Sequence, residues 1–290
     1  MKKLYIGDWN VSNAMLLDGE YVYTPFNVPF EVELLVVAGG GGGGQEYTDF
    51  LPYTRGGGGG AGGMVTGSFL ASINDTYTMS IGNGGAGADA SEETTNGSNS
   101  TFSSGSNIVT ANGGGGGANP RYQSDTNGNA GGSGGGAGTQ SGALGTAGLE
   151  TTGTSNFGTF TAFGEQGGTG AYCGTGQLFT GGGGGGAGSP GSQTQGGCST
   201  VSGAGLQLVD GITYAVGGGN NGGAIANRGY GGDPKNGGSA VGDSGSSGIV
   251  KLRYKGLQKA TGGTITESGG YIYHTFTSAD TFSVYSTVDA

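Results

Sequence analysis

A run of six consecutive glycines at residues 39–44 constrains this chain more than any other feature of its sequence. The run directly follows residues 33–38, Glu-Leu-Leu-Val-Val-Ala, whose long and branched apolar side chains are typical of a buried strand. Glycine loses more conformational freedom on folding than any other residue, so such a run is either disordered or ordered by contacts between backbones. Extended glycine segments in the polyproline II conformation can lie side by side and hydrogen-bond to one another. We therefore predict a lattice of polyglycine II helices.

The composition favours an ordered chain over a disordered one. Glycine supplies 76 of the 290 residues, without the strict Gly-X-Y period of collagen. Disordered chains combine high net charge with few aromatic residues, whereas here 10% of the residues are charged and there are 14 tyrosines and 11 phenylalanines. Because the apolar content is low for this length, backbone hydrogen bonds must supply much of the stability.

The charge and hydropathy of the chain argue against two kinds of partner. A net charge of −10 and a pI near 4.3 argue against nucleic acid, because phosphate contacts need clustered lysines and arginines. No apolar run is long enough to span a bilayer, so we expect no membrane insertion. Met1-Lys2-Lys3 resembles the start of a signal peptide, but Asp8 and Asn10 interrupt the apolar segment that such a peptide needs. We expect synthesis in a cytoplasm and release by another route, such as lysis.

No set of residues in the sequence has the pattern of a catalytic, cofactor or metal site. His274 is the only histidine, and no glycine run is followed by the Gly-Lys-Ser/Thr of a phosphate-binding loop. Residues 84–89 resemble a single calcium-binding repeat, which we interpret as a turn. Cys173 and Cys198 are too few for a disulfide framework, and they are either unpaired thiols or a bridge formed after release. We predict a protein that is not an enzyme and holds no cofactor and no metal.

The alternation of strand-like segments with glycine runs predicts a topology. If the strands mark a common base, successive runs lead out to a tip and back again. This interpretation gives five tip loops, at residues 45–55, 88–97, 118–130, 189–195 and 224–236, with residues 131–138 as a returning run. Residues 139–180 resist this assignment, because their glycines are sparse and their phenylalanines could mark either end. The predicted fold class is mostly irregular and β, with a layered bundle of polyglycine II helices above short base strands and little or no α-helix.

The two ends of the chain carry similar sequences. Residues 21–32 contain the pattern Tyr-apolar-Tyr-x-x-Phe, followed by Phe-polar-Val. The same pattern occurs again at residues 271–284. We therefore divide the chain into an N-terminal β attachment segment at residues 1–32, a glycine-rich sandwich at 33–255 and a C-terminal β segment at 256–290. Because exposed strand edges pair readily with other chains, we expect residues 1–32 and 262–290 to form an attachment and self-association surface.

Large aromatic and arginine side chains gather in three of the five expected tip loops. A glycine lattice has little need of them, and tyrosine and arginine are over-represented at binding hot spots. Such rings suit either a sugar or the apolar rim of a protein loop. The alternative is that the rings only cap the ends of the lattice. The candidate receptor-binding residues are Tyr47, Phe50, Tyr53, Arg55, Arg121, Tyr122, Arg228 and Tyr230.

Several of these features together resemble the glycine-rich domain of bacteriophage tail-fibre adhesins. They are Leu-Val-Val-Ala before six glycines, the Gly-Gly-Gly-Gly-Gly-Ala-Gly blocks, and the closing Ser-Gly-Ile-Val-x-Leu-Arg-Tyr. Residues 262–277, from Gly-Gly-Thr-Ile-Thr to His-Thr-Phe-Thr, are similar to a segment that recurs in phage structural proteins. The resemblance implies a sandwich of polyglycine II helices whose variable tip loops bind outer-membrane receptors. The long attachment domain of some tail-tip adhesins is replaced here by a short N-terminal segment.

The resemblance implies a virion protein made in the host cytoplasm, with a tail-fibre-type adhesin as its function. Its expected partners are a bacterial outer-membrane protein or surface glycan, other virion proteins and further copies of itself in a homotrimer. A structural fibre or capsid-decorating protein that uses the bundle as a rigid spacer is the alternative. An ice-binding protein would need flat faces of regular small residues, and the irregular aromatic loops count against it.

Overall fold

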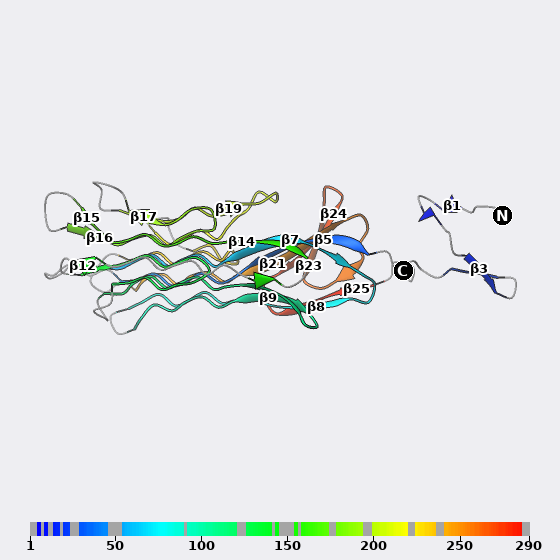
Figure 1. Ribbon diagram of the computed structural model, residues 1–290, viewed down its shortest axis with the longest axis horizontal. Coiled ribbons are helices and arrows are strands. Elements are labelled where there is room, and N and C mark those ends of the chain that lie inside the picture. Colours follow the sequence, from blue (N-terminus) through cyan, green and yellow to red (C-terminus); the bar gives the residue numbers. More distant parts are fainter. Residues whose placement is uncertain are drawn as a thin grey trace.

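The computed structural model describes residues 5–6, 9–10, 14–17, 20–23, 29–45, 54–89, 92–120, 126–140, 143–144, 154–155, 158–173, 178–193, 199–219, 224–235 and 241–285. Strands gather at one end of the elongated body, and extended glycine segments run from there to the other end (Figure 1). We call these ends the base and the tip. The described residues contain no helix, and hence none long and apolar enough to cross a membrane. The predicted fold class, mostly irregular and β with little or no α-helix, is confirmed.

The base is a sandwich of two antiparallel six-stranded sheets. In hydrogen-bonded order, the first sheet contains β13 (Thr154–Ser155), β10 (Asn107–Ala111), β9 (Ser100–Ser104), β8 (Thr76–Ser80), β25 (Asp280–Val284) and β22 (Ala260–Thr261). The second contains β14 (Thr159–Phe163), β7 (Met64–Ala71), β5 (Phe30–Val37), β21 (Ile249–Lys255), β24 (Tyr271–Phe276) and β23 (Thr264–Ser268). These strands reach eight residues, longer than the short base strands expected from the sequence.

The apolar core lies between these two sheets. Strand residues alternate between faces, so β5 directs Val32, Leu34 and Val36 inward and leaves Glu33 on the outer face. Phe102 of the first sheet is fully buried and stacks on Tyr77 with ring centroids 5.0 Å apart. Burying one such ring contributes about 2 kcal/mol. The other core residues are Ala38, Val65, Phe69, Ala71, Met79, Val109, Ala111, Val250, Leu252, Tyr254, Ala260, Ile272, Phe276, Phe282 and Val284.

The C-terminal segment is built into this sandwich. β24 pairs with β21 of the second sheet and β25 pairs with β8 of the first, so residues 256–284 share two sheets and one core with strands of residues 33–255. The N-terminal segment contains two hairpins, β1 (Tyr5–Ile6) with β2 (Trp9–Asn10) and β3 (Ala14–Leu17) with β4 (Glu20–Tyr23). Each hairpin forms a two-stranded sheet of its own.

The glycine run at residues 39–44 donates its N–H groups with a period of three. Gly39 and Gly42 donate to Ser98 and Thr95, Gly40 and Gly43 to Ser246 and Asp243, and Gly41 and Gly44 to Gly60 and Gly57. In each pair, the residue number of the acceptor decreases by three when that of the donor increases by three. The three neighbouring segments therefore run antiparallel to the glycine run. Three residues per turn is the repeat of the polyproline II conformation.

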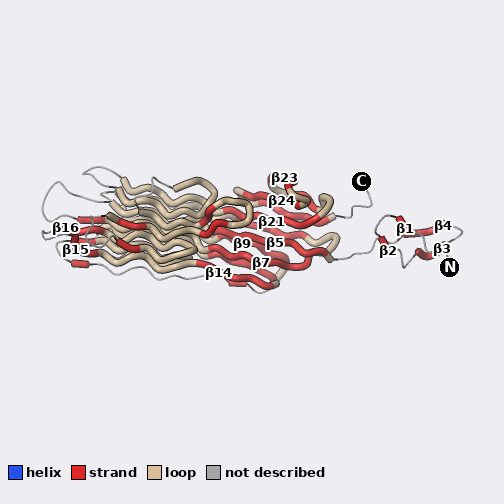
Figure 2. Tube along the Cα trace, turned by 90° about the horizontal axis from the view of Figure 1, so that it is seen from above, coloured by secondary structure: helices blue, strands red, loops and turns tan. Residues whose placement is uncertain are grey.

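The carbonyl groups of the same run bond three further segments, which run parallel to it. The donors are Gly114 and Gly117 to residues 39 and 42, Gly85 and Ala88 to residues 40 and 43, and Gly232 and Lys235 to residues 41 and 44. The run therefore has six hydrogen-bonded neighbours, as expected of a polyglycine II lattice. A Cβ atom on Gly41 would overlap the carbonyl of Gly115, which explains why this position requires glycine. Figure 2 shows the extended segments stacked in layers between base and tip.

Residues 126–140 take a different path from the predicted one. Gly132 donates to Gly113 near the base, at 2.6 Å, and Gly136 donates to Gly58 near the tip, at 2.7 Å. The chain thus returns over residues 126–131 and leads outward again over 134–138, so the prediction of residues 131–138 as a returning run is wrong. A glycine run has no side chains that distinguish an outward from an inward path.

Residues 139–180, which the sequence did not assign to either end, visit both ends. β11 (Thr139–Gln140) pairs with β12 (Ala143–Leu144) and with β6 (Thr54–Arg55) at the tip. β13 and β14 then belong to the two base sheets, and β15 (Ala171–Cys173) pairs with β16 (Leu178–Thr180) at the tip (Figure 1). Further short pairs are β17 (Ser192–Gln193) with β18 (Thr200–Val201) and β19 (Leu206–Gln207) with β20 (Thr213–Tyr214). Cys198 lies outside the described residues, so its pairing with Cys173 stays open.

The glycine run after β16 leads inward rather than outward. It ends at Ala187, which packs with Tyr214 in a second apolar cluster at the junction of base and lattice. The predicted tip loop at residues 224–236 is also wrong in its first half, since residues 226–229 form a turn at the base. Gly229 donates to Ser247, and both Asn227 and Gly229 have positive φ, 56° and 66°. Only the following residues, up to Lys235, lead to the tip.

Candidate functional site

The structure describes three of the eight residues predicted to bind a receptor. Tyr47, Phe50, Tyr53, Arg121 and Tyr122 lie outside the described residues. Arg55 is half-buried in β6 at the tip, where it pairs in register with Thr139. Arg228 and Tyr230 lie at the base, because the Ala215 N–H donates to the Arg228 carbonyl at 2.8 Å. The structure therefore does not bring these three residues together.

Tyr230 and Arg228 are half-buried parts of the framework. The Tyr230 hydroxyl donates to the carbonyl of Thr213 in β20 at 3.2 Å, and the Tyr230 N–H donates to the Ser246 hydroxyl at 2.7 Å. The prediction that these two residues occupy a tip loop is wrong. The prediction fails because the turn at residues 226–229 reverses the chain at the base, before the last outward segment begins.

The described floor of the tip holds buried polar groups without hydrogen-bond partners. They are the Gln45 Oε1, Thr54 Oγ1, Asn119 Oδ1 and Thr139 Oγ1 atoms. Gln45 and Thr54 flank one tip segment, Asn119 ends an outward run, and Thr139 belongs to β11. A buried polar group left without a partner costs about 1–3 kcal/mol. Within the described residues, such unpaired buried groups gather at the tip and not in the base.

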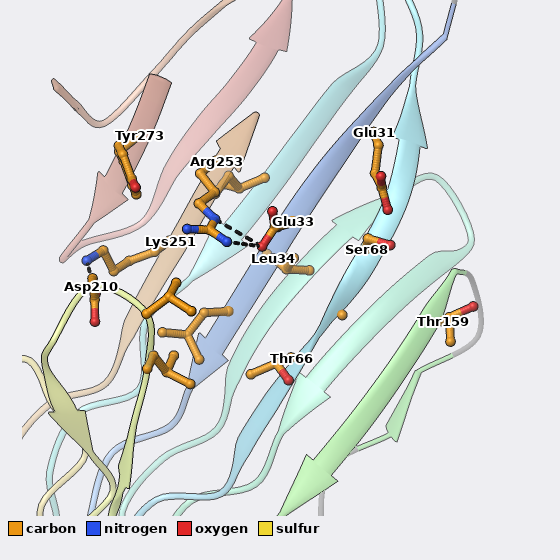
Figure 3. Close-up of a pocket in the computed structure, with 15 residues that line it drawn as sticks. Glu31, Glu33, Leu34, Thr66, Ser68, Thr159, Asp210, Lys251, Arg253 and Tyr273 are labelled. Atoms are coloured by element: carbon orange, nitrogen blue, oxygen red, sulfur yellow. Dashed lines mark hydrogen bonds and ion pairs between the residues drawn. The ribbon is translucent and has the colours of Figure 1, made fainter. Parts of the chain in front are cut away.

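A groove that sequence reasoning missed lies on the outer face of the second base sheet (Figure 3). Its volume is about 450 Å³, and it lies between β14 and the turn that joins β19 to β20. The floor consists of outward-facing residues of four adjacent strands, whereas Leu208, Val209 and Asp210 of the turn form one wall. The floor residues are Glu31, Glu33 and Leu35 of β5, Thr66 and Ser68 of β7, Lys251 and Arg253 of β21, and Tyr273 of β24.

An ion pair fixes the wall of the groove to its floor. Lys251 Nζ lies 2.6 Å from Asp210 Oδ2, and the Tyr214 hydroxyl donates to the same oxygen at 2.8 Å. Burial alone would raise the pKa of Asp210, but hydrogen bonds from Lys251, the Ile212 N–H and Tyr214 hold that pKa below its ordinary value. Burial and the contact with Asp210 raise the pKa of Tyr214. The turn is therefore a fixed wall at neutral pH.

A second ion pair lies across the floor. Arg253 donates from Nε and Nη2 to Glu33 Oε2, at 2.9 and 2.6 Å. Burial opposes the charge of Arg253, but the hydrogen bond to Glu33 raises its pKa. The guanidinium also lies over the ring of Tyr271, with 4.7 Å between its central carbon and the ring centroid. The sequence signal that could have indicated this groove is the pair of opposite charges, Glu33 and Arg253, at outward-facing positions of two strand-like segments.

A second groove of about 350 Å³ continues the first toward the outer end of the base. The two share Glu31, Glu33 and Arg253, and the second extends to Phe30, Lys255 and Tyr271. We call the combined depression the trough. It follows β5 from the turn at residues 208–211 to Phe30, the first residue of that strand.

The charged side chains of the trough largely pair with one another. Two of its acidic residues, Glu33 and Asp210, are in ion pairs, and none of the described residues that line it is a cysteine or a histidine. His274 faces the core between the sheets and is fully buried. Within the part of the chain that the structure describes, no three acidic, histidine or cysteine residues are grouped so that they could hold a metal ion.

The chain belongs to the glycine-rich domain family, whose model matches residues 16–255. The match covers the glycine lattice and most strands of the base, and it ends at the last residue of β21. No curated protein matches the chain.

Proposed function

We propose that this glycine-rich protein is a phage virion protein, a tail-fibre-type adhesin whose tip loops bind a bacterial outer-membrane protein or surface glycan. The observation that carries the proposal is the lattice itself. Six hydrogen-bonded neighbours around residues 39–44 make a stiff body without large side chains, and this body runs from the base strands to the opposite end, the tip (Figure 1). A stiff body of this kind suits display of the segments at its far end to a surface.

The tip residues that we assign to receptor binding are Tyr47, Phe50, Tyr53, Arg55, Arg121 and Tyr122. Arg228 and Tyr230 leave this set because of their place at the base. The buried polar atoms of the tip floor support a functional role for this end, since unsatisfied groups persist where function opposes stability. Sugars and apolar protein rims would both be bound by rings and guanidinium groups.

The base is the end that we assign to attachment within the virion, with other virion proteins and further copies of this chain in a homotrimer as partners. A structural fibre or capsid-decorating protein is the second candidate, because the same lattice would serve as a spacer. Binding to host cells separates the two candidates.

The test replaces residues 46–53 and 121–125 with Gly-Ser linkers of equal length and measures binding of the purified chain to host cells and its competition with phage adsorption. Gln45, Thr54 and Arg55 stay in place so that the tip floor is retained. The control replaces Ser106 by Asn in the exposed turn between β9 and β10 at the base. We expect binding to be lost only in the linker variants. Unchanged binding and adsorption in those variants would leave the spacer as the function.

A further inference from the structure

We infer that the trough on the second base sheet is a binding site for a neutral oligosaccharide, at the opposite end of the body from the tip. The larger of its two grooves has a volume of about 450 Å³. Small-molecule sites range from about 300 to 1,000 Å³. The lining combines balanced charges, hydrogen-bonding groups with spare capacity and an apolar wall, and a sugar ring suits all three.

The charges of the lining balance one another. Three acidic and three basic residues line the two grooves, namely Glu31, Glu33, Asp210, Lys251, Arg253 and Lys255. Four of them form the ion pairs Lys251–Asp210 and Arg253–Glu33. A charged ligand would have to compete with these pairs, and separating a partly buried pair is costly. A neutral ligand leaves both pairs intact, so the trough favours a ligand without charge.

The ion pair on the floor keeps hydrogen-bonding capacity for a ligand (Figure 3). Arg253 donates both of its bonds to Oε2 of Glu33, so within the described residues Oε1 remains as an acceptor. The two bonds use two of the five N–H groups of the guanidinium. A sugar hydroxyl both donates and accepts, so it can bond to the carboxylate and to the guanidinium at once. Because the ion pair already fixes both side chains, binding costs them little conformational freedom.

Hydroxyl groups beside this pair are also available. On the outer face of the first sheet, facing hydroxyls bond to each other, as Thr78 and Ser103 do at 3.1 Å. On the second sheet Ser68 faces Thr159 in register, yet within the described residues neither these two hydroxyls nor that of Thr66 has a hydrogen bond. Thr66 and Ser68 lie on β7, one strand spacing of about 4.8 Å from β5. The trough thus offers donors and acceptors on adjacent strands.

The wall of the trough adds an apolar surface to these polar groups. Val209 is 81% exposed and lies on the wall with Leu208, and the ring of Tyr273 lies at the other side of the floor. Water can satisfy the polar groups but gains nothing from Val209. A sugar ring carries hydroxyls at its edge and C–H groups on its faces, and such faces pack on aliphatic side chains and tyrosine rings.

The source of the sugar that we assign is a polysaccharide of the host surface whose chains extend outward past the molecule bound at the tip. This source rests on the proposed function, whereas the sugar chemistry of the trough does not. The site is separate from the tip, so the two ends can be tested independently of each other.

The first experiment applies the purified full chain to an array of short neutral and acidic oligosaccharides and titrates the neutral probe that is retained best. Thr66→Ala with Ser68→Ala removes two hydroxyls from the trough, and Thr101→Ala with Ser103→Ala removes two from the same positions of the other sheet. All four residues are half-buried on outer faces. We expect affinity about tenfold weaker or more in the trough variant and unchanged affinity in the control. Retention of acidic probes only, retention of none, or equal affinity in both variants would overturn the site.

The second experiment separates the trough from the tip. The chains with Gly-Ser linkers at residues 46–53 and 121–125 should bind the same neutral probe as tightly as wild type, whether or not they still bind host cells. Loss of the probe in these chains would move sugar binding to the tip and overturn the inference. Polysaccharide extracted from the host should displace the probe from wild type, and a lack of displacement would overturn the host as the source.

Discussion

The hydroxyl of Tyr254 lies 3.1 Å from Nε2 of His274, inside the core between the two base sheets. The other imidazole nitrogen, Nδ1, lies 2.8 Å from the carbonyl oxygen of Gly262. Because a carbonyl only accepts, Nδ1 carries the proton and Nε2 accepts from Tyr254. The same tyrosine oxygen accepts from the Lys259 N–H at 3.0 Å. The single histidine thus ties β24 to β21 and to the corner between β22 and β23.

Acid should destabilise the base through this histidine. Three rings, those of Tyr254, Phe276 and Phe282, surround the imidazole, and burial lowers the pKa of His274 despite the hydrogen bond to Gly262. The unfolded chain takes up the proton near the ordinary value of 6.5, so stability is full above that pH and falls as the pH drops from 6.5 toward the lower folded pKa. Melting temperatures of wild type and His274→Asn between pH 7.5 and 5 measure the effect. The wild type should show the steeper fall, and parallel curves would contradict the assignment.

Side chains placed inside the lattice should destabilise it strongly. A Cβ on Gly41 would overlap the Gly115 carbonyl and one on Gly184 that of Gly59, and backbone cannot move aside as a flexible side chain can. We expect Gly41→Val and Gly184→Val to lower the free energy of unfolding by about 3 kcal/mol or more. Gly105→Asn is the control, because nothing lies within 4 Å of a Cβ there and asparagine tolerates its φ of 58°. Melting temperatures in the valine variants equal to that of the control would exclude a packed lattice at these positions.

The ion pair of Asp210 should contribute more to the free energy of unfolding than the ion pair of Asp243. The side chains of Lys251 and Asp210 are each 17% exposed, whereas those of Lys235 and Asp243 are 41% and 31% exposed. Asp210→Ala leaves a half-buried lysine and a tyrosine hydroxyl without their acceptor, and we expect a loss of about 2 kcal/mol. Asp243→Ala should cost less than about 1 kcal/mol.

Urea unfolding of both variants, repeated at low pH, measures the difference. Because the pKa of Asp210 is lowered from its ordinary value of 3.8, the stability it provides is present above that pH. The gap between wild type and Asp210→Ala should therefore narrow as the pH falls below 3.8. A gap that is the same at both pH values would exclude the charge of Asp210 as its cause.

Deletion of residues 262–290 should abolish folding rather than only assembly. The deletion removes β23, β24 and β25, and with them the fully buried Phe276 and Phe282. A chain that ends after Tyr285 retains all of these strands and serves as the control. Circular dichroism and soluble yield measure the result. A folded chain after the larger deletion would show that the base does not depend on its C-terminal strands.

The N-terminal and C-terminal β segments show where sequence similarity and structural role separate. The repeated Tyr-apolar-Tyr pattern correctly indicated strands at both ends, since alternation of side chains between faces is a local property. It could not indicate that β24 and β25 enter two different sheets, because pairing partners lie up to some two hundred residues away along the chain, as β25 with β8 shows. We expected residues 262–290 to form a self-association surface because exposed strand edges pair with other chains. β24 and β25 pair instead with strands of their own chain, so these pairings are not open to a second copy.

By itself, the sequence determined the local states of the chain. Glycine runs such as residues 39–44 can be ordered only by backbone contacts, so the lattice followed from the glycine content. Strands with alternating side chains, such as residues 249–255, bury one face and expose the other, so the strands followed from the period of the apolar residues. The tertiary structure decided the direction of each run, because a glycine segment looks the same outward and inward, which is why Tyr230 was expected at the wrong end. It also decided the trough, since Glu33, Asp210 and Arg253 are brought together only by the pairing of β5 with β21 and the packing of the turn over both.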